Sequence, residues 1–351
     1  MHAQARVDGT TPRSGSRPLV GSLLRLAGLL GLAAVLAAVV VFSLWAGTLE
    51  ITPEELWAVF TGTGREVHEL VIWELRAPRA GLAVAVGAAL GVAGALLAAL
   101  SRNRLADPVF GGAGFTSAAF VVLAVGAFRL TDFHAYIWFA FLGAALALIV
   151  GHFLPATRAP GHPLKRAFAA AGVSLTLAVV VHIATTRAPD TFAGSRMWVF
   201  GSLNAATGDR LAALAPYLGA GLLFAFVLMW PLRRIDAPGA TRFAGEGGRN
   251  TLIRAGVALT LVILCGAATA ATGPIAFLGL AAPALARMLV GDDVRWIAAY
   301  SAFLGPILLI AADLAGRTLD TTRELEAGLV TAVVGVPLLI VLAWRMRAGR
   351  T

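Results

Sequence analysis

Residues 74–108 read ELRAPRAGLAVAVGAALGVAGALLAALSRNRLADP, and residues 80–101 within this stretch contain no charged side chain. About 20 predominantly apolar residues in a helix cross the hydrocarbon core of a bilayer. Three glycines in the stretch recur at helical spacing: Gly87, Gly91 and Gly94. Small residues on one helix face let neighbouring helices approach closely in lipid, so the stretch predicts a transmembrane helix with a packing seam, which we favour over a role of the glycines in a transport pathway.

The composition of the whole chain supports a membrane setting. Of its 351 residues 58% are hydrophobic and only 13% are charged, and the mean hydropathy is +0.82. A soluble domain normally carries about 25% charged residues. The polar surface is therefore too small to coat a soluble particle, and the lipid bilayer is expected to be the main solvent.

Apolar segments recur along the chain, separated by clusters of Arg, Asp, Pro and Gly. They cover approximately 23–46, 79–100, 108–128, 136–154, 167–186, 211–230, 251–271, 275–290, 296–316 and 328–344. Backbone groups in lipid need internal partners, and the segments lack the alternation of barrel strands, so helices are predicted. The eighth segment is short and interrupted by proline, so a full crossing is left open there.

The expected fold is thus an all-α integral membrane protein of about ten transmembrane helices. A polar cytoplasmic tail (1–22) precedes the membrane domain (23–345), and a short cytoplasmic tail (346–351) follows it. The first apolar segment is longer than the core of a cleaved signal peptide, so it is expected to be retained.

Basic residues set the expected orientation. With the N-terminus inside, 19 Lys and Arg fall in cytoplasmic segments and 9 in outer ones. Cytoplasmic loops carry the excess of basic residues, so both termini are predicted to be cytoplasmic. The net charge of +9 is spread over short loops, which argues against a nucleic-acid partner.

Charged residues inside the apolar segments are nearly absent. Asp313 is the main exception, and Arg317 follows it four residues later, at a helical pairing distance. Ion-driven carriers usually need buried carboxylates or histidines, so the scarcity suggests that energy enters elsewhere. The chain also lacks a GxxxxGK[ST] nucleotide-binding loop. No catalytic residue, metal site or cofactor of its own is predicted; His182 is interpreted as a packed histidine.

Several motifs together resemble one family. They are RAPR at Arg76, SRNRLADP at Ser101, MWVFGSL at Met197, GPIAFLGLAAPALARMLVG at Gly273, ADLAGR at Ala312 and ELEAGLVTAVVGVP at Glu324. Because these motifs occur in the order and at the spacing of the family, the chain resembles the FecCD-type permeases for iron siderophores, haem and cobalamin, from about residue 20 to the end.

The resemblance implies the permease subunit of a type II ABC importer in a bacterial inner membrane, which is not itself an enzyme. It implies a second permease subunit, two ATPase subunits that use the ATP, and an extracytoplasmic substrate-binding protein. A ferric siderophore is the expected cargo, with cobalamin or haem as alternatives. A self-sufficient secondary transporter is the competing class. Arg104 stands where the family has proline and Ala284 where it has histidine, so a heterodimer with a second permease is left open.

The resemblance also assigns roles to individual residues. It implies that the binding protein docks on Arg76, Arg79 and Arg317. The alternative role is membrane anchoring for the first two and pairing with Asp313 for the third. The cytoplasmic gate falls to Asn103, Leu105, Lys165 and Arg166, and the ATPase coupling loop to Gly239, Arg242 and Gly247. The polar contacts expected along the pathway are Ser174, Thr176, Thr185 and Thr186.

Overall fold

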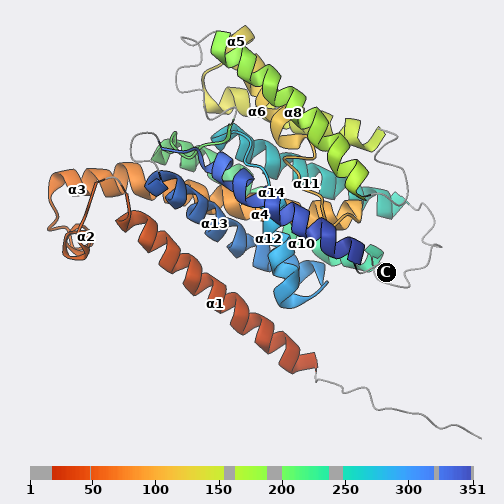
Figure 1. Ribbon diagram of the computed structural model, residues 1–351, viewed down its shortest axis with the longest axis horizontal. Coiled ribbons are helices and arrows are strands. Elements are labelled where there is room, and N and C mark those ends of the chain that lie inside the picture. Colours follow the sequence, from red (N-terminus) through yellow and green to blue (C-terminus); the bar gives the residue numbers. More distant parts are fainter. Residues whose placement is uncertain are drawn as a thin grey trace, which may run out of the picture.

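The computed structural model describes residues 18–47, 49–153, 163–187, 200–236, 248–319 and 324–348, and all regular elements in these ranges are helical. The helices are α1 (Pro18–Trp45), α2 (Pro53–Phe60), α3 (Glu66–Leu70), the π-helical turn η1 (Val71–Arg76), α4 (Ala77–Ser101), α5 (Ala113–Phe128), α6 (Phe133–Phe153), α8 (Pro163–Arg187), α10 (Gly208–Asp236), α11 (Gly248–Thr272), α12 (Leu278–Val290), α13 (Val294–Leu319) and α14 (Ala327–Ala348). Figure 1 shows them as a bundle of roughly aligned helices.

Each predicted apolar segment contains a helix. Within the described ranges, six helices are long and apolar enough to cross a membrane, and four shorter apolar helices accompany them. The all-helical fold is therefore confirmed, while ten complete crossings stay a prediction. Helix α1 begins at Pro18 and α14 runs to Ala348, so both helices extend beyond the predicted membrane domain (23–345), whose bounds stay a prediction.

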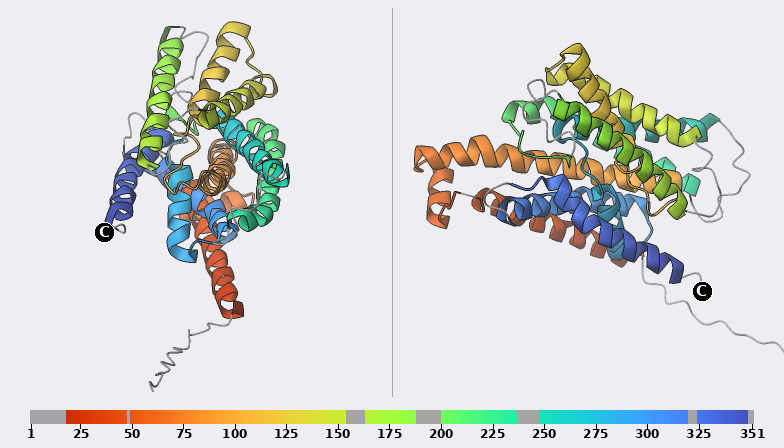
Figure 2. Two further views of the ribbon diagram at one scale, coloured as in Figure 1. Left: turned by 90° about the vertical axis from the view of Figure 1, so that its right-hand side faces the viewer. Right: turned by 45° about the horizontal axis from the view of Figure 1, so that its top comes forward.

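Helix α4 lies at the centre of the bundle and packs against α10, α11, α12 and α13. Helix α1 lies along one edge, mainly against α13, and α5, α6 and α8 gather on the opposite side (Figures 1 and 2). A central helix must bury its whole circumference, which explains why α4 is apolar all round.

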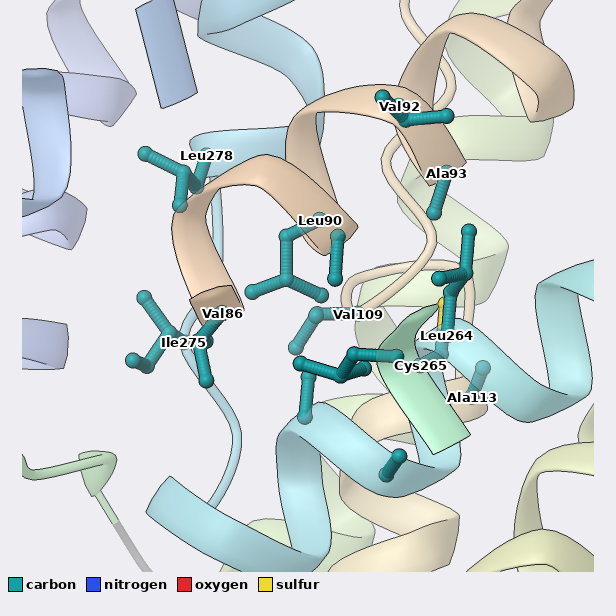
Figure 3. Close-up of a cluster of buried hydrophobic side chains, with 14 of the residues drawn as sticks. Val86, Leu90, Val92, Ala93, Val109, Ala113, Leu264, Cys265, Ile275 and Leu278 are labelled. Carbon is teal, nitrogen blue, oxygen red and sulfur yellow. The ribbon is translucent and has the colours of Figure 1, made fainter. Parts of the chain in front are cut away.

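The packed interior consists of small and branched apolar side chains around α4. Figure 3 shows Val86 and Leu90 of α4 beside Leu264 and Cys265 of α11. These four side chains are at most 1% exposed. Because lipid is as apolar as these side chains, tight packing and not the exclusion of water holds such helices together.

The glycine stripe of α4 is a packing seam, as predicted. A Cβ on Gly87 would lie 2.6 Å from the Cα of Pro306, and one on Gly91 would collide with the carbonyl oxygen of Ser301, both on α13. Gly94 meets the backbone of Gly279 at the start of α12. The stripe thus brings α4 into backbone contact with two other helices.

Two segments differ from a simple crossing. The third was predicted from residue 108, but α5 begins only at Ala113, and residues 102–112 form a loop. The eighth consists of a non-helical stretch, 273–277, followed by α12. Thirteen residues of α12 span only about 20 Å, less than the roughly 30 Å of a hydrocarbon core.

The second predicted segment is extended at its start. The helical path begins at Glu66 and runs through α3 and η1 into α4. The N–H of Ala77 donates to the carbonyl of Ile72, five residues earlier, which makes the π-helical turn. Pro78 follows directly and has no N–H to continue the usual pattern.

The bundle has two ends with different residues. Helix α1 begins and α14 ends at the same end, on the right of Figure 1. The opposite end holds η1, the start of α4 and the end of α13. These elements carry Arg76, Arg79 and Arg317, and we call this end the arginine end.

Candidate functional site

Arg76 fastens the end of the first helix. Its Nη1 donates to the carbonyl oxygens of Leu44 (2.8 Å) and Trp45 (2.6 Å), and its Nη2 donates to that of Leu49 (2.7 Å). The last carbonyls of a helix lack partners within the helix, and a cation there is favourable. Arg76 is only 6% exposed. Its guanidinium group is thus engaged by backbone carbonyls of this chain, and its docking role stays a prediction.

Asp313 holds the other two arginines together. Arg79 donates from Nε (3.0 Å) and Nη2 (2.8 Å) to Oδ1 of Asp313. Arg317 lies with its Nε 3.2 Å from Oδ2, so the pair expected from their four-residue spacing is confirmed. Arg317 also donates from Nη2 to the hydroxyl of Ser43, at 3.0 Å. One buried carboxylate thus joins α4 to α13, and Arg317 extends the contact to α1.

Glu324 completes the cluster at the arginine end. Its Oε2 accepts a hydrogen bond from Nη1 of Arg79 at 2.9 Å. From the sequence alone no role was expected for this glutamate, although it opens the ELEAG motif. Nothing in the local pattern pairs it with an arginine 245 positions earlier. Only the fold brings the two together.

The predicted gate residues Asn103 and Leu105 lie in the loop between α4 and α5. Both are buried, and Oδ1 of Asn103 accepts the N–H of Leu105 at 3.1 Å. The hydroxyl of Ser174 on α8 donates to the carbonyl of Phe110 at 2.9 Å. Phe110 in turn packs its ring 4.6 Å from that of Phe277, just before α12. The loop is therefore held from two sides.

Asp107 is a buried carboxylate in the same loop. No role for it was expected from the sequence. Its Oδ1 accepts the N–H of Phe110 at 2.8 Å, which closes the turn. Its Oδ2 faces the first turn of α12 and would lie 3.2 Å from a Cβ on Gly279. Burial raises the pKa of this carboxyl to about 6, and the N–H groups of its own turn and of α12 act in the opposite direction.

The polar residues of α8 divide into two sets. Ser174 and Thr185 are buried, whereas Thr176 and Thr186 are exposed. The three threonines donate to carbonyls of their own helix, those of Gly172, Val181 and His182. Such bonds satisfy a hydroxyl in an apolar setting. Contact of these residues with a transported molecule stays a prediction.

The remaining predicted residues are less fully described. Lys165 and Arg166 fall in the first turn of α8, but their side chains lie outside the described part of the structure. Gly239, Arg242 and Gly247 lie in 237–247, also outside the described residues. Among the residues that are described, no three His, Cys, Asp or Glu side chains gather as a metal site.

An apolar cavity of about 200 Å³ lies between α12, α13 and α14. Phe277, Leu308, Ala312, Val334 and Gly335 contribute to its wall, and Thr331 is its polar residue. Gly335 faces the ring of Phe277, so a side chain there would reduce the space.

Comparison with known proteins identifies the family. The model of the FecCD transport family matches residues 35–345. The chain belongs to the FecCD transport family. As a family member it is a multi-pass membrane permease of a bacterial ABC importer and has no catalytic role of its own.

Three curated relatives of this FecCD permease cover most of its length. The ferric enterobactin transport system permease protein FepD of Escherichia coli (strain K12) is 32% identical over 91% of this chain and 95% of its own. The iron(3+)-hydroxamate import system permease protein FhuG of Bacillus subtilis (strain 168) is 33% identical over 87% and 93%. The Fe(3+)-citrate import system permease protein YfmD of the same organism is 32% identical over 81% and 83%.

A solved structure shares the fold. It is described as an inward-facing conformation of a metal-chelate type ABC transporter, and it superposes with a TM-score of 0.71. The alignment covers 90% of this FecCD permease and 98% of that chain, at 23% identity.

Proposed function

We propose that this permease forms the membrane pathway of an ATP-driven importer for a ferric siderophore or a related iron chelate. The observation that carries the proposal is that the relatives agree on the kind of cargo: their names include ferric enterobactin, iron(3+)-hydroxamate and Fe(3+)-citrate. Each of them aligns with more than four fifths of this chain. Cobalamin and haem are the alternative cargoes.

The permease works with both termini in the cytoplasm and with a second permease subunit, identical or different, beside it. ATP is bound and hydrolysed by separate ATPase subunits, which the loop containing Gly239, Arg242 and Gly247 contacts. The excess of basic residues on the side of the termini supports this orientation. The arginine end then faces outward, where a substrate-binding protein docks.

Docking depends on arginine because its planar fork pairs with carboxylates through parallel hydrogen bonds. Arg79 is the best-placed residue, since its Nη1 donates to the exposed Glu324 and to no other described residue. Arg76 and Arg317 are buried and hold the helices of the arginine end in place through their hydrogen bonds and ion pair. At the other end, Asn103, Leu105, Lys165 and Arg166 form the cytoplasmic gate, and Ser174, Thr176, Thr185 and Thr186 contact the cargo.

Uptake into proteoliposomes tests the energy source. Vesicles holding the permease, its ATPase and its binding protein should accumulate iron-loaded siderophore only when ATP is present on the ATPase side. Vesicles without the ATPase and under a proton gradient are the control. Uptake driven by that gradient alone would assign the chain to secondary transporters instead.

Growth tests the cargo. A deletion strain complemented with this permease is grown on single iron sources: ferric siderophores, ferric citrate and haem. Cobalamin dependence is scored in parallel. Rescue on at least one ferric chelate is expected. If the permease restores only cobalamin-dependent growth, or if it changes growth on no iron source, the iron assignment is wrong.

A further inference from the structure

Arg79 presents two different edges of its guanidinium group. The edge made by Nε and Nη2 faces Asp313, whose side chain is 3% exposed. The remaining nitrogen, Nη1, donates to Glu324, whose side chain is 34% exposed. The side chain of Arg79 is itself 14% exposed. Glu324 is thus the more exposed of the two carboxylates bound to Arg79, and it accepts one of the two N–H groups of Nη1, the nitrogen that an incoming carboxylate would use.

We propose that Glu324 is an internal competitor for docking, which covers Arg79 until a carboxylate of the binding protein displaces it. The inference rests on the proposed docking at the arginine end. It adds a residue of this chain that regulates that surface, and it assigns Arg79 as the arginine that the partner reaches.

The two carboxylates on Arg79 differ in how easily they can leave. An ion pair with an exposed partner contributes little, because water solvates both charges when it opens. Asp313 is buried and shared with Arg317, and separating a buried pair leaves an uncompensated charge. Glu324 is thus the carboxylate that exchanges, while Asp313 keeps Arg79 in place for the incoming partner.

The position of Glu324 in the chain also suits an exchangeable contact. It precedes α14, which begins at Ala327, and it lies outside any helix. The side chain can swing away without disturbing a helical hydrogen bond. With Glu324 gone, the cluster of Arg76, Arg79, Arg317 and Asp313 has three positive charges against one negative, so an acidic partner is attracted more strongly.

The test is a double-mutant cycle on the complete importer in lipid nanodiscs, with its own substrate-binding protein as the probe. The variants are Glu324→Gln, Arg79→Gln and their combination. Glu74→Gln is the matched control, because it removes an exposed carboxylate of the neighbouring turn η1. Affinity is measured at low and at high salt.

Glu324→Gln is expected to tighten docking roughly two- to fivefold at low salt, the size of an exposed ion pair. The gain should shrink at high salt and vanish in the Arg79→Gln background. A gain no larger than that of Glu74→Gln, or a loss, overturns the inference. If Arg79→Gln leaves the affinity unchanged, docking through Arg79 itself is refuted, and the inference falls with it.

Arg79→Gln leaves Asp313 without one partner, so this variant can fail to fold. Modification of Arg79 by phenylglyoxal in the full-length protein, followed by mass spectrometry, then replaces the cycle. Glu324→Gln should be modified faster at Arg79 than the wild type and Glu74→Gln, because Nη1 is uncovered. Equal rates in all three proteins would show that Glu324 does not cover Arg79.

Discussion

Gly94 on α4 lies against the backbone carbonyl of Gly279 at the start of α12, with no room for a side chain between them. On the other side of Gly279, the Cδ of Pro108, in the loop between α4 and α5, would lie 2.5 Å from an added Cβ. The start of α12 is therefore clamped between the central helix and the loop that carries the predicted gate residues. This contact explains why both positions require glycine.

Replacing Gly94 with Ala should push α12 away from α4. Overpacking a tight interface costs about 1–3 kcal/mol, so thermal unfolding in detergent should occur at a lower temperature. Gly219→Ala on α10 is the control, because no atom lies within 4 Å of its added Cβ. Equal unfolding temperatures for the two variants would contradict the clamp.

Replacing Arg76 with Ala should free the end of α1. The change removes the donor to three carbonyls at buried or half-buried sites, and we expect a loss of about 2–4 kcal/mol in the free energy of unfolding. Arg65→Ala is the control, since Arg65 is exposed at the start of α3. If Arg76 had only a docking role, Arg76→Ala would instead weaken binding of the partner and leave thermal unfolding unchanged.

Asp107 should make stability depend on pH. Its pKa rises from 3.8 to about 6 in the folded protein, so the folded state binds the proton more tightly than the unfolded state. Stability is therefore lost as the pH rises through this window. Relative to Asp107→Asn, the wild type should gain about 1 kcal/mol between about pH 7 and about pH 5.

Denaturant unfolding of both proteins at each pH measures this difference. The control is Asp209→Asn, which makes the same change at an exposed position. Parallel pH profiles for the wild type and Asp107→Asn would show that the carboxyl of Asp107 does not titrate in this range.

Replacing Gly239 or Gly247 with Val should separate ATP hydrolysis from uptake. Glycine permits turn geometry that a branched side chain resists, so the loop would no longer fit the ATPase. The measurement is the amount of siderophore imported per ATP hydrolysed in proteoliposomes, which should fall while the protein still reaches the membrane. Gly21→Val, at an open position of α1, controls for expression. Full transport by both loop variants would refute the coupling role.

Much of the architecture followed from the sequence alone. The apolar segments predicted the helices, because the affinity of a segment for lipid is a sum over its own residues and needs no partner. The short eighth segment and the glycine stripe were also predictable, since proline and glycine act on the local backbone. The ordered motifs indicated the FecCD family, which the family model confirmed.

The tertiary structure alone decided which polar groups from distant parts of the chain meet. Arg79 pairs with Asp313 across 234 positions and Arg76 reaches α1 across 32, and no local pattern encodes either contact. The same holds for Glu324 beside Arg79 and for Asp107 beneath α12. Hydropathy specifies where a residue can reside, but a hydrogen bond needs two atoms at about 3 Å, and only the packing of distant helices sets that distance.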